Sequence, residues 1–215
     1  MLGKMIGYLI KIRRYSNQRK MMEKIRHIGK DTTISMSVDI TFPQHLSIGE
    51  GCFIGGNSII DSRGGIKIGN YSSLGVNALL LSTDHRYVGV ETIPFDDVRV
   101  IKPIVMGDFV WGGANVSIMP GVTIGDGAIL GLSCVITEDV PPMAIMVGNP
   151  AKIVSYRNIE QFERLRKEGK FRAMSKKAKR LWIPPFIKGK HGNVLEELGF
   201  DIRALGSKVF DDPNF

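Results

Sequence analysis

Hydrophobic residues recur every six positions between Met106 and Pro141. Most of these hexads begin with an aliphatic residue followed by a small one, as at Ile124-Gly125, and a second apolar residue follows four positions after the first. Such a short fixed period is the signature of a solenoid. Six extended residues span about 20 Å, so three hexads joined at corners make a triangular coil that stacks about 4.8 Å above the previous one. The pattern therefore predicts a mainly β protein, a parallel β-helix whose apolar hexad positions point inward.

The same frame appears earlier in the chain, from Ile34 to Leu80, with a two-residue slip at Gly64-Gly65. About five coils therefore fit between residues 31 and 141. Leu80 and Met106 lie 26 positions apart where one hexad allows 6, so about 20 residues must leave the prism as a loop, placed at residues 83–103. Long excursions from a repeat scaffold usually carry function.

Charge divides the chain into three parts. Residues 1–30 hold nine Lys or Arg against one acid, residues 31–155 hold six against twelve, and residues 156–215 hold fourteen against eight. We therefore expect a basic helical segment over 1–30, a β-helix domain over 31–155 and a basic helical extension over 156–215. No RNA- or DNA-binding motif accompanies the basic residues, so a nucleic-acid partner is not expected.

The segment before the repeats has two possible roles, and the segment after them has one. The amphipathic residues 1–30 either cap the first coil or dock peripherally on the anionic inner face of a membrane. Leu2–Ile12 is too short and too charged to span a bilayer, and Cys52 and Cys134 occupy inward positions as free thiols, so we expect a cytoplasmic protein. Asn158, three residues before Gln161, predicts the start of a helix that closes the far end of the prism.

Residues 110–154 carry a family resemblance. Their sequence, VWGGANVSIMPGVTIGDGAILGLSCVITEDVPPMAIMVGNPAKIV, resembles the closing signature of the left-handed β-helix hexapeptide-repeat acyltransferases, in the branch of galactoside, maltose and polysaccharide O-acetyltransferases. The resemblance implies a left-handed coil, against the usual right-handed crossover, and a homotrimer with its active sites between neighbouring prisms. It also implies transfer of acetyl from acetyl-CoA to a sugar hydroxyl, with a loop histidine as general base and no metal.

His85 matches the catalytic histidine of that family, in the sequence LSTDH. A sugar hydroxyl has a pKa far above 7, so its attack on a thioester needs a proton acceptor, and imidazole titrates near the working pH. Without the resemblance, His85 is more simply a turn residue. A base also needs an orienting group, and among the loop acids Asp84, Glu91, Asp96 and Asp97 we choose Asp84.

Trp111 matches the tryptophan that packs against the pantetheine arm in the family, and we expect it to point outward from a corner; the alternative is an ordinary surface aromatic. Relatives usually read Trp-Ile-Gly where this chain has Trp111-Gly112-Gly113, a change that either loosens the coil or makes room for a larger neighbour. The further cofactor positions that the resemblance implies are Gly113, Ala114, Leu132, Thr137 and Lys152. Of these, Lys152 faces the coenzyme's phosphates in the family, although a solvated surface lysine is the simpler interpretation.

The acceptor side is less well marked. Asn57, Asp61 and Asn77 match the face that meets the sugar in relatives, although Asn and Asp at corners often only form turns. Residues 1–30 do not match the helical domain of relatives that act on small free sugars, which favours a surface polysaccharide or a lipid-linked glycan as acceptor. The alternatives are an N-acetyltransferase of an amino sugar or antibiotic, an inactive structural β-helix, and a metal-dependent hydratase, which would need three converging histidines.

Overall fold

The computed structural model describes residues 18–172, 186–188 and 209–211. The chain divides into two compact units, Met1–Ser175 and Lys176–Phe215. In the second unit, β20 (Phe186–Lys188) pairs in parallel with β21 (Val209–Asp211). Residues 1–17 of the predicted helical segment 1–30, and most of the predicted extension 156–215 beyond residue 172, lie outside the described residues.

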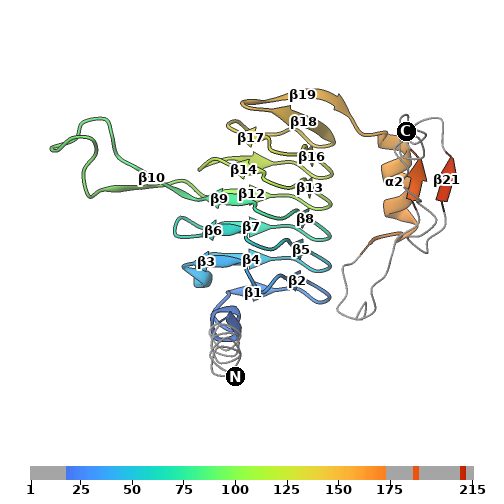
Figure 1. The fold of residues 1–215 in the computed structure, drawn as a ribbon, viewed down its shortest axis with the longest axis horizontal. Coiled ribbons are helices and arrows are strands. Elements are labelled where there is room, and N and C mark those ends of the chain that lie inside the picture. Colours follow the sequence, from blue (N-terminus) through green and yellow to red (C-terminus); the bar gives the residue numbers. More distant parts are fainter. Residues whose placement is uncertain (1–17, 173–185, 189–208, 212–215) are drawn as a thin grey trace, which may run out of the picture. The chain divides into compact units, whose positions relative to one another are not determined.

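The first unit is a parallel β-helix with three sheets, so the predicted fold is confirmed (Figure 1). The first sheet consists of β1 (His27–Ile28), β4 (Leu46–Ile48), β7 (Ile66–Ile68), β12 (Ile104–Met106) and β15 (Thr123–Ile124). The second sheet consists of β2 (Thr33–Ile34), β5 (Phe53–Ile54), β8 (Ser73–Leu74), β13 (Trp111–Gly112), β16 (Ile129–Leu130) and β18 (Ala144–Gly148), with β19 (Ala151–Tyr156) at its edge. The third sheet consists of β3 (Asp39–Thr41), β6 (Ile59–Asp61), β9 (Leu79–Leu81), β14 (Ser117–Ile118) and β17 (Val135–Ile136).

Each coil runs through the three sheets in order and turns at three corners. We call them the first corner (from first to second sheet), the second corner (from second to third) and the third corner (from third to the next coil's first). The inward aliphatics form one core, in which Ile54, Leu74 and Leu130 are fully buried. Glycine follows many strands because coils stack closely there: a Cβ on Gly75 would lie 2.6 Å from the backbone nitrogen of Ala114.

The number of residues in a coil varies, and the variation arises at the third corner. Strand register pairs Ile48 with Ile68, Ile68 with Met106, and Met106 with Ile124, so successive coils advance by 20, 38 and 18 residues. The coil of 18 is the simple one, the coils of 20 contain the two-residue slip, and the coil of 38 contains the predicted excursion. The predicted loop of about 20 residues is therefore confirmed.

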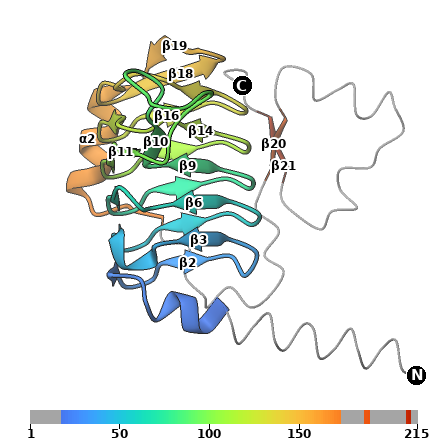
Figure 2. The ribbon, with the colours of Figure 1, turned by 90° about the vertical axis from the view of Figure 1, so that its left-hand side faces the viewer.

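The two ends of the prism are covered in different ways. Residues 18–22 are helical, and their Met21 and Met22 pack against the core beneath the first coil, as a cap does (Figure 2). At the other end, β18 pairs with β16, and β19 folds back antiparallel on β18. None of the described helices is long and apolar enough to span a bilayer.

Helix α2 (Ile159–Lys167) begins as predicted, because the Asn158 side chain accepts a hydrogen bond from the Gln161 N–H at 2.9 Å. Our prediction that it closes the far end of the prism is wrong. The helix lies along the first corner, where the Phe162 ring meets the edge of Phe109 at 5.7 Å. Gly127 makes room for this contact, since a Cβ there would lie 3.1 Å from the Phe162 ring.

Candidate functional site

The third corner carries the long excursion, and it is a built structure rather than an open loop. Its two arms, β10 (Thr83–His85) and β11 (Arg99–Ile101), pair antiparallel, with His85 opposite Arg99 (Figure 1). Farther out, the Arg86 guanidinium donates to the Asp96 carboxylate, which also accepts from the Val98 N–H at 3.0 Å. This contact lowers the pKa of Asp96. Its carboxylate stabilises the ribbon and is therefore not available to orient His85.

His85 lies at the root of this ribbon, half-buried. Its ring packs against Phe95, with 4.0 Å between the ring centroids. Among the described residues its buried Nδ1 has no hydrogen-bond partner. Asp84 accepts from the backbone N–H of His85 at 2.9 Å and meets the Lys102 ammonium at 3.4 Å, so its carboxylate holds the backbone and makes no hydrogen bond to the imidazole. Packing against Phe95 therefore fixes the ring more directly than Asp84 does.

Trp111 lies within strand β13, so our placement of this residue at a corner is wrong, although its side chain does point outward and is 55% exposed. Side chains alternate along a strand, so the outward Trp111 is followed by the inward Gly112. A Cβ on Gly112 would lie 2.7 Å from Cδ2 of Leu74 in the coil below. The missing aliphatic at position 112 thus leaves room for a larger neighbour, Leu74, and the coil is not loosened.

The second corner gathers five of the predicted site residues in successive coils: Asn57, Asn77, Gly113, Ala114 and Leu132. Asn57 and Asn77 both have φ of 58°, a left-handed conformation that asparagine tolerates well. Asn77 also donates to the side chain of Asn115 at 2.9 Å. Turn geometry is therefore a sufficient reason for both asparagines, whereas Leu132 is 70% exposed with no such reason.

The remaining predicted residues lie elsewhere. Asp61 ends β6 at the third corner, where its carboxylate accepts from the Arg63 N–H at 3.1 Å and lies 3.7 Å from the Arg63 guanidinium. Thr137 follows β17, also at the third corner, and is exposed. Lys152 is exposed on β19, opposite Val147 at the edge of the second sheet. The structure thus separates the acceptor candidates Asn57 and Asn77 from Asp61.

His85 and Trp111 lie on opposite sides of the prism. In a three-sided prism each corner faces the opposite sheet, so the third corner, which carries His85, faces away from the second sheet, which carries Trp111. Figure 1 shows the β10 ribbon leaving on one side and β13 and α2 on the other. His85 and Trp111 of the same chain therefore do not meet.

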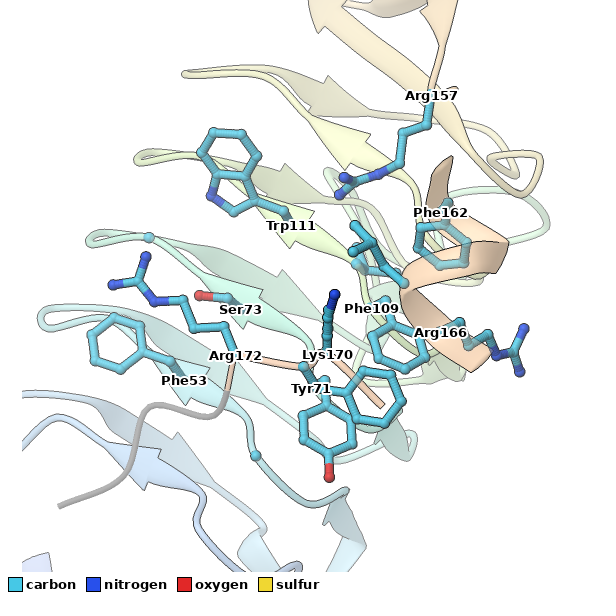
Figure 3. A pocket seen from close by; sticks show the side chains of 15 residues that line it. Phe53, Tyr71, Ser73, Phe109, Trp111, Arg157, Phe162, Arg166, Lys170 and Arg172 are labelled. Carbon is cyan, nitrogen blue, oxygen red and sulfur yellow. The ribbon is translucent and has the colours of Figure 1, made fainter. Parts of the chain in front are cut away.

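A cavity of about 650 Å³ lies on the second sheet, between Trp111 and α2 (Figure 3). Aromatic rings line its lower side, where Tyr71 stacks on Phe109 at 5.5 Å and Phe171 packs against Tyr71 at 4.7 Å. The sequence did not predict this cavity. The available signal was the set of aromatic residues on outward strand positions and on α2, but their meeting depends on where the helix docks.

Neither cysteine offers a nucleophile. Cys52 and Cys134 are free and fully buried, and burial raises the pKa of both thiols, that of Cys134 to about 11. The thiolate is the reactive form, and almost none of it exists at neutral pH with such a pKa. The part of the chain that the structure describes also contains no group of three His, Cys, Asp or Glu side chains placed to hold a metal ion.

Known proteins share both the sequence pattern and the prism. Residues 45–81 and 103–138 match the family described as hexapeptide repeat of succinyl-transferase. An Escherichia coli (strain K12) protein named "Putative colanic acid biosynthesis acetyltransferase" is 32% identical over 131 residues, covering 60% of this chain and 69% of that one.

Two solved structures are also similar. A hexapeptide-repeat acetyltransferase of Vibrio cholerae, complexed with acetyl-coenzyme A, has a TM-score of 0.58 and 28% identity over 63% of this chain and 73% of its own. A maltose O-acetyltransferase of Clostridium difficile has a TM-score of 0.58 and 26% identity over 63% of this chain and 72% of its own.

Proposed function

This chain belongs to the hexapeptide-repeat acetyltransferase family, and on that premise we propose that it transfers acetyl from acetyl-coenzyme A to a sugar hydroxyl of a surface polysaccharide or a lipid-linked glycan. The observation that carries the proposal is His85, an imidazole fixed against Phe95 where the ribbon leaves the prism. Because its Nδ1 is buried, Nε2 is the nitrogen left to meet a substrate.

The reaction needs one proton acceptor and one proton donor, and His85 serves as both. It takes the proton of the acceptor hydroxyl as the oxygen attacks the thioester carbonyl carbon. The new C–O bond forms, the C–S bond breaks, and the imidazolium returns the proton to the coenzyme's thiolate. Asp84 contributes by holding the His85 backbone and Lys102 at the ribbon's root.

We propose that each active site lies between two chains of a homotrimer, with His85 from one chain and Trp111 from its neighbour. The opposite placement of these residues in one prism supports this arrangement. Exposed apolar side chains along the second corner also support a covered surface, since contiguous apolar patches commonly mark contacts. They are Met36, Val76, Leu132 and Val147, which are 42–70% exposed.

Acetyl-CoA fits along the second corner in this proposal. Trp111 offers its exposed face to the pantetheine arm. Within the described residues, the backbone N–H groups of Ala114 and Leu132 make no hydrogen bond, so they are available to the pantetheine amides. The Gly113 N–H already donates to the Leu130 carbonyl oxygen, so Gly113 contributes only by having no side chain in the way of the coenzyme. Lys152 faces the phosphates from β19, and Thr137 completes the site from the third corner of the neighbouring chain.

We propose a glycan hydroxyl as the acceptor because residues 110–154 resemble the sugar O-acetyltransferases. Of the acceptor candidates, Asp61 lies at the third corner, which also carries the ribbon. An amine acceptor would use the same base, and an inactive scaffold would need neither His85 nor Trp111. Product analysis by mass spectrometry distinguishes an ester from an amide, because only the ester is cleaved by mild alkali.

The His85→Ala variant tests the general base. We expect it to remain folded, to bind acetyl-CoA and to lose about 10²–10⁴ in kcat. His27→Ala is the matched control, because His27 is an exposed histidine on β1 outside the proposed site. Transfer by His85→Ala within threefold of the parent would exclude this role.

Residues 1–30 are proposed to hold the enzyme beside a lipid-linked acceptor, since each cation near an anionic membrane surface contributes about 1 kcal/mol. Co-sedimentation with anionic vesicles should fall steeply with salt and vanish when Arg13, Arg14, Arg19 and Lys20 become Glu. If the chain does not bind vesicles at low salt, the segment acts as a cap alone.

A further inference from the structure

The cavity between the second sheet and α2 has the chemistry of a phosphate-ester site (Figure 3). We infer that it binds the phosphate or diphosphate group of the acceptor, with the adjoining apolar or aromatic part resting on the cavity's rings. The inference rests on the proposed acetyl transfer, which it deepens by naming the class of acceptor: an activated, phosphate-linked sugar rather than a free one.

The floor of the cavity is a column of three outward side chains in register. Phe53 of β5 pairs with Ser73 of β8, which pairs with Trp111 of β13, so the Ser73 hydroxyl lies between two aromatic residues in successive coils. Outward positions of a solvated prism are ordinarily polar, and two large rings there indicate a surface that something covers. A flat base or a polyprenyl chain has the apolar area that these rings can contact.

Cationic residues lie at several points around the cavity (Figure 3). Among the described residues that line the cavity there is no Asp or Glu, but there are four cations: Arg157, Arg166, Lys170 and Arg172. Arg166 and Lys170 reach Glu163 and Glu168 at 3.7 and 2.6 Å, but neither acid lines the cavity. Positive groups gathered over a low-dielectric surface focus their field on an anion that enters between them.

Arg157 is the most telling of these cations. Its Nε donates to the backbone oxygen of Gly127, its guanidinium lies 5.9 Å from the Phe162 ring, and in the described residues no carboxylate pairs with it. Burial lowers its pKa, which means that the charged form is partly stripped of water without a compensating anion. A partly buried cation is stabilised by an opposite charge, so a phosphate from a ligand would complete this environment.

These features together exclude a free sugar as the preferred occupant, because a sugar offers neither a negative charge nor a large apolar face. Arginine recognises phosphate through paired hydrogen bonds, and about 650 Å³ is within the usual range for small-molecule sites. The coenzyme's own phosphates are assigned to Lys152 on β19, whereas this cavity extends from Trp111 down to Phe53. Trp111 borders both regions, which would bring the acceptor beside the acyl donor.

Calorimetric titration of the full chain with uridine diphosphate, farnesyl diphosphate and inorganic diphosphate tests the inference, with and without saturating coenzyme A. We expect at least one organic diphosphate to bind below about 100 μM, a specific small-ligand affinity, and still to bind when coenzyme A is present. Tighter binding of uridine diphosphate assigns a nucleotide-linked acceptor, and tighter binding of farnesyl diphosphate assigns a lipid-linked one.

The double variant Arg166→Gln, Lys170→Gln should weaken organic diphosphate binding at least about tenfold, since hydrogen bonds to charged groups are strong. Arg164→Gln is the matched control, because Arg164 is on the same helix and does not line the cavity. Phe53→Ala is a second test: it should weaken the organic diphosphates and leave inorganic diphosphate unchanged.

The inference is overturned if no organic diphosphate binds at 1 mM, if the double variant binds as the parent does, or if coenzyme A displaces both ligands. The same samples are titrated with acetyl-CoA alone. Loss of acetyl-CoA binding or of any transfer would contradict the proposed function, whereas normal acetyl-CoA binding without diphosphate binding contradicts only the assignment of this cavity.

Discussion

Mixing two impaired variants provides the sharpest test of the site. His85→Ala removes the proposed base at the third corner, and Trp111→Ala removes the coenzyme contact on the second sheet. These positions lie on opposite sides of one prism, and in the proposed trimer a site takes His85 from one chain and Trp111 from the next. A mixed trimer therefore contains some interfaces with neither lesion, although every chain in it carries one.

The expected recovery follows from the geometry alone. When equal amounts of the variants assemble at random, position 85 at a given interface is still histidine half of the time. Position 111, on the other chain, is still tryptophan half of the time. About one quarter of the sites are then complete in a cyclic trimer. The parents set a low baseline, because losing the base costs about 10²–10⁴ and losing a large aromatic contact costs roughly 1.5–3 kcal/mol, about tenfold or more.

The assay is initial acetyl transfer at limiting acetyl-CoA after the variants are dissociated together in mild denaturant and reassembled. Native mass spectrometry of differently tagged chains verifies mixing, and the same variants combined without dissociation serve as the control. Activity near one quarter of the parent enzyme supports the shared site. Activity that stays at the average of the two variants, in trimers proven to be mixed, would refute the reasoning, because a site within one chain gains nothing from its neighbour.

Three further predictions concern the scaffold and the ribbon. Gly112→Ile should lower the free energy of unfolding by about 1–3 kcal/mol through its clash with Leu74, and thermal denaturation should show partial rescue by Leu74→Ala. Arg86 depresses the pKa of Asp96, so the ribbon's support from this pair is present above the ordinary carboxyl pKa of about 3.9 and is lost as the pH falls through the depressed value. Pepsin should then cut the ribbon of the parent only below about pH 4, but that of Arg86→Gln at pH 5. Cys134, with its pKa raised to about 11, should resist a thiol reagent at pH 8 until the chain is unfolded, and rapid labelling of native protein would contradict its burial.

The sequence was sufficient to predict the coils, because stacking leaves little freedom. Every strand must bring an aliphatic side chain to the core at a fixed spacing, so the gap between Leu80 and Met106 had to leave the prism. His85 could be placed at the root of that excursion for the same reason. Trp111 was misplaced because hexad position six, which it occupies, was taken as a corner, whereas in the structure positions six and one form the strands, as in Trp111–Gly112 and Ile129–Leu130.

Features that depend on docking could not be predicted. Asn158 marks the start of α2 clearly, but nothing in the helix's own sequence states that Phe162 will meet Phe109 at the first corner. The cavity beside Trp111 exists only through that contact. The structural role of Asp96 could not be predicted either, because it depends on a contact with Arg86 across the ribbon, ten residues away in the sequence.

The unequal coils have a consequence for how such a protein can change. Successive coils take 16, 18, 20 or 38 residues while the strands above and below keep their register, since Leu130 pairs with Met146, Met106 with Ile124, Ile48 with Ile68 and Ile68 with Met106. Packing of the core does not depend on what is inserted at the third corner, because the strands on either side of an insertion keep the same pairing with the coils above and below. The edge that bears His85 is thus the edge most open to insertion and replacement, and new side chains can be added there without a change in the core of the prism. The other two corners, closed by glycine and by left-handed turns, have no such freedom.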